Sequence, residues 1–452
     1  MCIFSSCNSY KPQPDDSQVD DPVEESGAES QIDDYVKKIP SFADEYKKAS
    51  DAFDKSDIAG AKNIFADLYK QYPELPPPGI FLLQFFIQSK NGNNIKPILE
   101  MTTNETPNDP EAYILLADVA LQQQELTAAE LLLLEAESKL TKYSVNTTRK
   151  KSMTSSLLRS QSLLAEVRGR WKDYEELATK RIKHDGESAI LLRQKGIALF
   201  QQNKEAEAEK IFQLADKIKT KKTKQNTEQG LPAEAMLSRL YATRGNNEKS
   251  KKLLNDALEK YPNSKEVILL SIQSRLDENK PEEAKILADK LAANFPEFEA
   301  ATKIKATIAL YLNDFTTAEK LFQDLIILAP SDHQAKNGLA LALCEQNDPK
   351  KLKRALEYAN DNVNKNQQNS EYWSTLGWIL LNTKQIDAAK QALQQSINTS
   401  NGSITPATAY YLAQLEKQTG NKNQAKQLLE KALQNQTPFA KRRDAQKLLN
   451  EL

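Results

Sequence analysis

The sequence is poor in the residues from which catalytic and metal sites are usually built. Its 452 residues include 13 glycines, three cysteines and two histidines. Few glycines disfavour a turn-rich all-β chain and leave little material for phosphate-binding loops. The scattered cysteines and histidines leave little for a metal site, and no nucleophile elbow, Walker loop or dinucleotide motif occurs. We therefore expect no enzymatic activity, no cofactor and no metal.

The sequence also lacks an excess of either charge and lacks long apolar runs. Lysine and arginine total 61 against 62 aspartates and glutamates, which gives a net charge of −1. This balance argues against recognition of nucleic acid through overall charge. No apolar run approaches the ~18 residues of a membrane-spanning helix. The composition favours a helical chain that acts by contact with a partner.

Residues 1–7 form a short apolar start that ends at Cys7, after two small residues. They resemble the end of a bacterial lipoprotein signal, although the positive start and the 7–15 apolar residues of a complete signal are missing. One interpretation is that the true start lies upstream and that Cys7 is lipidated. Since no aspartate follows Cys7, the resemblance then implies attachment to the outer membrane of the cell envelope. The alternative is an ordinary cytosolic N-terminus.

Residues 8–41 are predicted to be an acidic disordered linker. Between residues 8 and 34 there are nine aspartates and glutamates but only one lysine, with three prolines and few apolar side chains. Such a segment buries too little apolar surface to offset the entropy lost on ordering, and its like charges extend it.

The rest of the chain repeats with a period of 34 residues. Three consecutive helix-length phrases each end in a proline, at Pro262, Pro296 and Pro330. A small residue stands twelve positions before each proline, at Ser250, Ala284 and Ala318. A fixed period of this length is typical of a helical solenoid. Repeat units are predicted to start near residues 42, 76, 110, 155, 189, 231, 265, 299, 331, 370 and 406, with insertions near 144–154 and 223–230.

Each unit has the residues that a pair of packed helices requires. The eighth residue is usually small, as at Ala117 and Gly196, which allows two helices to cross closely. A turn-forming residue near the fifteenth position separates the helices, as at Asn203 and Gly245. In the second helix a small residue precedes an apolar one by four positions, so both lie on one face.

The motif Trp373-x-x-Leu376-Gly377 and the recurring Ala-x-x-x-Phe pair, as in Ala318 and Phe322, resemble the tetratricopeptide repeat family. The resemblance covers residues 42–438. It implies an all-α, right-handed solenoid of about eleven helix pairs, in which the first helix of each pair lines a concave groove that binds peptides or helices. Residues 439–452 are predicted to form a capping helix, with its leucines on the last unit and its lysines and arginines in solvent.

The fifth, sixth and ninth residues of each unit are predicted to line this groove. Among them basic residues exceed acidic ones by five, and Asp118 is the one acidic member. The proposed partner-binding residues are Arg159, Arg193, Arg239, Lys303, Lys336, Trp378, Tyr410 and Tyr411. They indicate a basic, partly aromatic groove for an acidic extended segment of a partner protein. The alternative is that these cations pair with acids of the chain itself, such as Glu111, Glu166, Glu266 and Asp277.

Lysines also cluster at both insertions, at positions 217–224 and around Arg149. These residues indicate either a site for an anionic surface or nucleic acid or, as we favour, solvated helix ends and loops.

The leading hypothesis for the whole chain is a non-enzymatic protein-binding scaffold attached to the bacterial envelope. A soluble cytosolic adaptor and an anionic-surface binder remain alternatives. An enzyme is disfavoured because the repeats leave no room for a catalytic domain.

Overall fold

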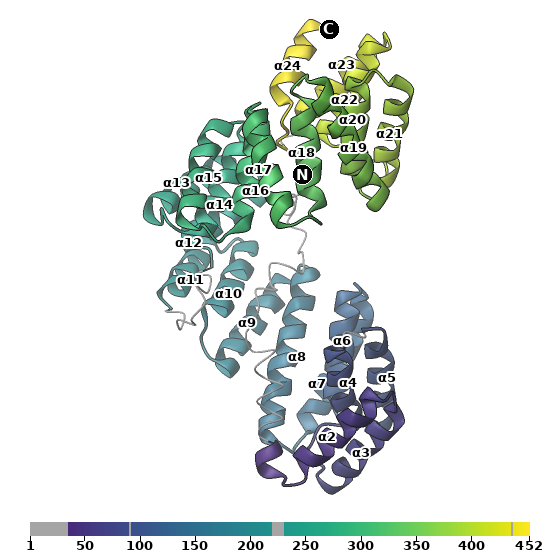
Figure 1. The fold of residues 1–452 in the computed structure, drawn as a ribbon. Coiled ribbons are helices and arrows are strands. Elements are labelled where there is room, and N and C mark those ends of the chain that lie inside the picture. Colours follow the sequence, from purple (N-terminus) through teal and green to yellow (C-terminus); the bar gives the residue numbers. More distant parts are fainter. Residues whose placement is uncertain (1–34, 90–91, 219–229, 435–436) are drawn as a thin grey trace. The chain divides into compact units, whose positions relative to one another are not determined.

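The computed structural model describes residues 35–89, 92–218, 230–434 and 437–452 (Figure 1). Within these residues the regular elements are helices, and no strand occurs. The all-α prediction is therefore confirmed. The chain divides into two compact units between residues 228 and 229. We describe them separately, as an N-terminal unit (35–218) and a C-terminal unit (230–452). The predicted linker up to residue 34 and most of the 223–230 insertion lie outside the described residues.

The N-terminal unit contains five consecutive helix pairs and one short 3-10 turn, η1, before α5. The elements are α2 (Phe42–Asp54), α3 (Ile58–Gln71), α4 (Pro78–Gln88), η1 (Gly92–Asn94), α5 (Ile95–Glu105), α6 (Glu111–Gln122), α7 (Leu126–Lys142), α8 (Thr147–Val167), α9 (Trp171–Asp185), α10 (Ala189–Gln201) and α11 (Glu205–Lys217).

The C-terminal unit contains six helix pairs and one final helix. The elements are α12 (Ala233–Thr243), α13 (Asn247–Lys260), α14 (Lys265–Asp277), α15 (Pro281–Asn294), α16 (Glu299–Tyr311), α17 (Phe315–Leu328), α18 (His333–Cys344), α19 (Pro349–Lys365), α20 (Ser370–Asn382), α21 (Ile386–Thr399), α22 (Pro406–Gln418), α23 (Lys422–Gln434) and α24 (Arg442–Glu451).

The first helices of the pairs begin within two residues of the predicted starts at ten of eleven units. The exception is α8, which begins at Thr147 rather than near residue 155. Most of the predicted 144–154 insertion is therefore helical, and it lengthens α8 at its N-terminal end. The side chain of Asn146 starts this extension, because its oxygen accepts a hydrogen bond of 3.0 Å from the backbone N–H of Arg149.

Residues 35–41 were included in the predicted disordered linker, and that part of the prediction is wrong. Tyr35 and Ile39 are buried in the first apolar cluster of the N-terminal unit. The Tyr35 ring lies 5.6 Å from that of Phe42 and 6.4 Å from that of Phe81. These two apolar residues gain enough contact with the first helix pairs to order the segment.

The turns inside the pairs confirm the role of the predicted turn residues. Asn203 and Gly245 both have a positive φ, at 64° and 74°. Asparagine takes this left-handed position at several other turns of the chain. This use of asparagine explains how so many helix pairs form with few glycines.

The predicted close crossings are also present. Gly196 on α10 faces Phe212 on α11, and a Cβ placed on Gly196 would lie 2.5 Å from a ring carbon of Phe212. At the same position of another unit, Gly377 faces Leu393 in the same way, with 2.6 Å. The bulky residue thus fills the space that the missing side chain leaves.

We predict that Gly196→Val destabilises the N-terminal unit by about 1–3 kcal/mol, because the added carbons overlap the Phe212 ring. Urea denaturation followed by circular dichroism measures the loss. As a matched control, Gly196→Val combined with Phe212→Leu relieves the overlap. The double variant should be less destabilised than the sum of the two single changes. Strict additivity would contradict this account of the crossing.

Candidate partner-binding surfaces

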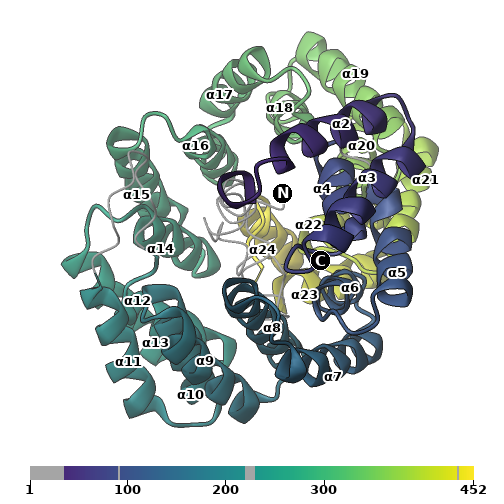
Figure 2. The ribbon, with the colours of Figure 1, turned by 90° about the horizontal axis from the view of Figure 1, so that it is seen from below.

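Within the C-terminal unit the first helices of successive pairs lie next to one another. Contacts join α16 to α18, α18 to α20 and α20 to α22. In Figure 2 these helices lie on the inner side of the unit, and α17, α19 and α21 lie outside them. We use the term inner face for the surface that the first helices present. The predicted groove residues belong to these first helices.

In the N-terminal unit two predicted groove arginines each lie beside an aspartate. Arg159 on α8 lies 3.7 Å from Asp118 on α6, and Arg193 on α10 lies 3.5 Å from Asp216 on α11. Burial lowers the pKa of the Arg193 guanidinium, and the charge of Asp216 opposes this effect. Arg193 is therefore largely buried beside an acid of the chain itself, in line with the alternative left open for the groove cations.

In the C-terminal unit two predicted groove lysines have similar neighbours. Lys303 pairs with Asp332 at 2.7 Å, and Lys336 lies 3.8 Å from Asp361. Arg239 on α12 is half-buried. The acids beside Lys303 and Lys336 are not among the four that the sequence analysis named. The basic excess of the inner faces is therefore partly balanced within the chain.

The three predicted aromatic groove residues form one buried stack in the C-terminal unit. Trp378 on α20 lies 4.7 Å from Tyr411 on α22 with nearly parallel rings, and 5.7 Å from Tyr410. Trp378, Tyr410 and Tyr411 are only 7%, 4% and 6% exposed. Burial raises the pKa of the Tyr410 hydroxyl to about 12. As the structure stands, these side chains do not reach a partner.

The chain's own C-terminal segment, residues 437–452, packs into the apolar cluster that contains this stack. Phe439, Ala445 and Leu448 are buried in the same apolar cluster as the three aromatic residues. Leu449 and Leu452 pack against that cluster. In Figure 2, α24 lies on the inner side of the unit, close to α22. The predicted contact of the leucines with the end of the solenoid is thus present.

Polar contacts hold this segment to helices well upstream of the last pair. The Tyr311 hydroxyl, at the end of α16, donates a hydrogen bond of 3.1 Å to the carbonyl of Pro438. Lys441 Nζ lies 2.5 Å from Glu345, directly after α18, and also lies over the Phe315 ring. Arg443 pairs with Glu282 on α15 at 2.8 Å. The prediction that Lys441 stays in solvent is wrong, because its ammonium is nearly buried against Glu345.

Glu345 is the central residue of this contact, and the sequence analysis missed it. Its Oε1 accepts a hydrogen bond of 2.8 Å from the Trp378 indole, and its Oε2 takes Lys441. Asp277, Tyr311 and Glu345 are spaced at intervals of 34 residues, at the ends of three successive first helices. The spacing is visible in the sequence, but these three residues are not at the fifth, sixth or ninth positions of a unit, which were predicted to line the groove.

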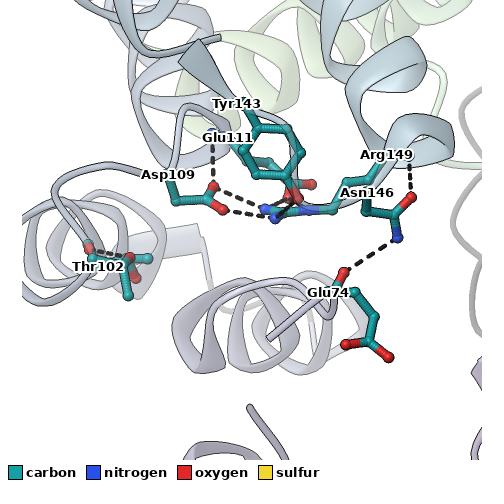
Figure 3. Close-up of polar contacts among 8 residues, drawn as sticks. Glu74, Thr102, Asp109, Glu111, Tyr143, Asn146 and Arg149 are labelled. Carbon is teal, nitrogen blue, oxygen red and sulfur yellow. Dashed lines mark hydrogen bonds and ion pairs between the residues drawn. The ribbon is translucent and has the colours of Figure 1, made fainter. Parts of the chain in front are cut away.

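A buried arginine braces α8 in the N-terminal unit (Figure 3). Arg149 makes two hydrogen bonds to Asp109, two to Glu111 and one to the Tyr143 hydroxyl, so all five of its N–H groups have acceptors. Asn146 donates to the carbonyl of Glu74 at 3.3 Å. Burial acts to lower the pKa of Arg149, but the charges of Glu111 and Asp109 outweigh it and raise the pKa above its usual value. The favoured view of Arg149 as a solvated loop residue is wrong.

The remaining candidate residues have structural contacts. The ring of His184 hydrogen-bonds the carbonyl of Lys151, and that of His333 contacts Asn362. Cys344 is buried, which raises the pKa of its thiol. Among the described residues, no three His, Cys, Asp or Glu side chains group as for a metal ion. In the same part of the chain, no helix is both long and apolar enough to cross a bilayer. Cys7 and four of the five lysines at positions 217–224 lie outside the described residues.

Comparison with known proteins identifies the repeats. Family models described as tetratricopeptide repeat match residues 235–264, 305–361 and 370–401, all in the C-terminal unit. No curated protein sequence matches the chain significantly.

Solved structures of other proteins align with this chain at low sequence identity. A tetratricopeptide repeat protein from Parabacteroides merdae is 14% identical, with 66% of this chain and 97% of that one covered and a TM-score of 0.36. Yeast Tom70 is 13% identical over 90% and 95% of the two chains, with a TM-score of 0.35. PilF of Pseudomonas aeruginosa is 18% identical over 49% and 96%, with a TM-score of 0.32.

We predict that Arg149→Met destabilises the N-terminal unit by about 3–5 kcal/mol, because it leaves the Asp109 and Glu111 carboxylates without their cation. Chemical denaturation measures this loss. Arg168→Met is the matched control at the other end of α8. Arg168 pairs with Glu130 at 2.9 Å in a half-exposed setting, so its loss should cost under about 1 kcal/mol. Equal effects of the two variants would refute the bracing role of Arg149.

A second prediction concerns the pH dependence of stability near the C-terminal segment. Burial raises the pKa of Asp277 to about 6, although Gln273 donates a hydrogen bond of 2.6 Å to its carboxylate. The folded chain therefore keeps a proton that the unfolded chain releases near pH 4. Stability from this group is present below pH 4 and is lost as the pH rises through about 6.

Asp277→Asn keeps the acceptor for Gln273 and removes the charge. We expect the variant to be more stable than wild type at pH 7.5, by on the order of 1–2 kcal/mol. The difference should shrink toward zero at pH 4. Urea denaturation of both proteins at the two pH values measures it. A difference that does not change with pH would contradict the raised pKa.

Proposed function

Because this chain is a tetratricopeptide repeat protein, we propose that it is a scaffold that binds segments of partner proteins on its inner faces. Proteins of this repeat family are typically protein-interaction modules. The observation that supports groove binding here is internal to the chain: the inner face of the C-terminal unit already holds residues 438–452 through side chains of α16, α20 and α22 and the residue after α18. A surface that holds one helical segment has the shape and chemistry to hold another.

For the N-terminal unit we propose an acidic extended segment as the ligand. Arg159 and Arg193 lie on the first helices of successive pairs, and an arginine fork bonds a carboxylate through two parallel N–H groups. Arg159 lies 3.7 Å from Asp118, and Arg193 lies 3.5 Å from Asp216. Carboxylates of a partner would compete with Asp118 and Asp216 for these cations.

Attachment to the cell envelope through a lipid on Cys7 remains part of the proposal. Its support is the resemblance of residues 1–7 to the end of a lipoprotein signal. Metabolic labelling with an alkyne fatty acid, in wild type and in Cys7→Ala, tests it. Label on wild type alone supports the anchor, whereas no label on either favours the soluble cytosolic adaptor.

The binding proposal predicts that Arg159→Gln with Arg193→Gln weakens partner capture at least several-fold. Glutamine is chosen because a glutamate at position 193 would face Asp216 and disturb folding. The measurement is quantitative cross-linking capture from the native cell, with full-length chains.

The matched control is Lys172→Gln with Lys183→Gln, which removes the same charge from the exposed side of α9. This control should capture as wild type does. If the two double variants capture the same partners equally, the basic part of the inner face is not the binding surface.

A further inference from the structure

The contacts of the C-terminal segment exceed those that an end cap needs. A cap covers the apolar face of the last pair, which here is α22 and α23. Residues 438–443 instead contact Tyr311, Glu345 and Glu282, which belong to pairs two to four positions upstream. The segment therefore follows the inner face as a bound ligand would.

The segment is also poorly suited to form a helix by itself. The helix α24 has ten residues, and no side chain caps its N-terminus. Arg442 and Arg443 stand in its first turn, and its last turn has no basic residue. The two arginines oppose the helix dipole, whereas Asp444 in the same turn favours it, and isolated helices of this length are marginal in water. Its order thus comes from the surface beneath it, which is typical of elements that open locally.

We propose that this surface, formed by Tyr311, Glu345, Trp378, Tyr410 and Tyr411, is a partner-binding site in which the C-terminal segment is a resident placeholder. The inference rests on the proposed scaffold function and names its ligand in the C-terminal unit. The ligand is an amphipathic helix of a partner protein, preceded by an aromatic residue and a lysine, and it displaces residues 438–452.

The resident segment defines the chemistry of this ligand. Phe439 fills the apolar cluster, and Lys441 meets Glu345 two residues later. Ala445, Leu448, Leu449 and Leu452 then follow at the spacing of one helix face. An acidic partner is excluded here, because its carboxylates would face Glu345. The two units thus differ in the charge of the ligand that they select.

The test uses full-length protein and a labelled synthetic peptide of residues 437–452 as the probe. In wild type the tethered segment competes at an effective concentration on the order of millimolar, so the peptide binds weakly. Lys441→Glu in the protein sets two carboxylates against each other and loosens the resident segment. We expect this variant to bind the wild-type peptide at least tenfold more tightly than wild type does, by fluorescence anisotropy.

Trp378 supplies a second readout. In a background of Trp171→Phe and Trp373→Phe, it is the remaining tryptophan of the chain. Lys441→Glu should shift its emission to the red and increase its quenching by acrylamide, and added peptide should reverse both changes. The matched control is Lys447→Glu, on the exposed side of α24, which should behave as wild type in both assays. If Lys441→Glu does not fold, Lys441→Gln replaces it with the same expected direction.

Equal peptide affinity of wild type and the folded Lys441 variant would overturn the inference and make α24 a permanent cap. A wild-type dimer held by exchanged C-terminal segments would overturn it as well, because the occupant would then be a second copy. Neither result involves Arg159 or Arg193. The scaffold function is therefore tested separately, by the capture experiment with full-length chains that carry the changes at Arg159 and Arg193.

Discussion

One steric constraint recurs along the helix pairs: a residue with little or no side chain on one helix receives a bulky apolar side chain from a neighbouring helix. Gly196 with Phe212 and Gly377 with Leu393 show the contact directly, and Ala49 and Ala117 are completely buried at the same position. The contact is local to neighbouring helices, so the stack is a sum of similar steps. The helices can consequently vary in length, as the 21 residues of α8 show.

Because this constraint selects residue types at fixed intervals, the sequence alone predicts most of the fold. The 34-residue period locates ten of the eleven first helices within two residues. It fails at α8, since the extension depends on partners that a periodic pattern does not contain. The acceptors of Arg149 lie about forty residues earlier, at Asp109 and Glu111. Without knowledge of these acceptors, a stretch rich in lysine and arginine resembles a solvated loop. With them, Arg149 is a buried core residue whose five N–H groups all have acceptors.

The sequence predicts which residues lie on the inner faces better than it predicts the net charge of those faces. The repeat register correctly assigns Arg193 and Lys336 to first helices. The charge count, however, included only residues of those helices. The acids that lie beside them, Asp216 and Asp361, are on second helices. A count along one helix therefore overestimates the local field, because a groove is lined by both members of each pair. The net electrostatic potential of the groove therefore also depends on side chains of the second helices.

In the C-terminal unit one carboxylate serves two different donors. Glu345 accepts the Trp378 indole N–H on one oxygen and the Lys441 ammonium on the other. When the segment leaves, the indole keeps its acceptor, so no buried N–H of the aromatic stack is left unpaired. Opening then costs the ion pairs of Lys441 and Arg443, the hydrogen bond from Tyr311 to Pro438, and the apolar contacts of Phe439 and Leu448. A ligand with a lysine at the same place restores the missing contact, so the carboxylate favours replacement of the segment over an empty surface.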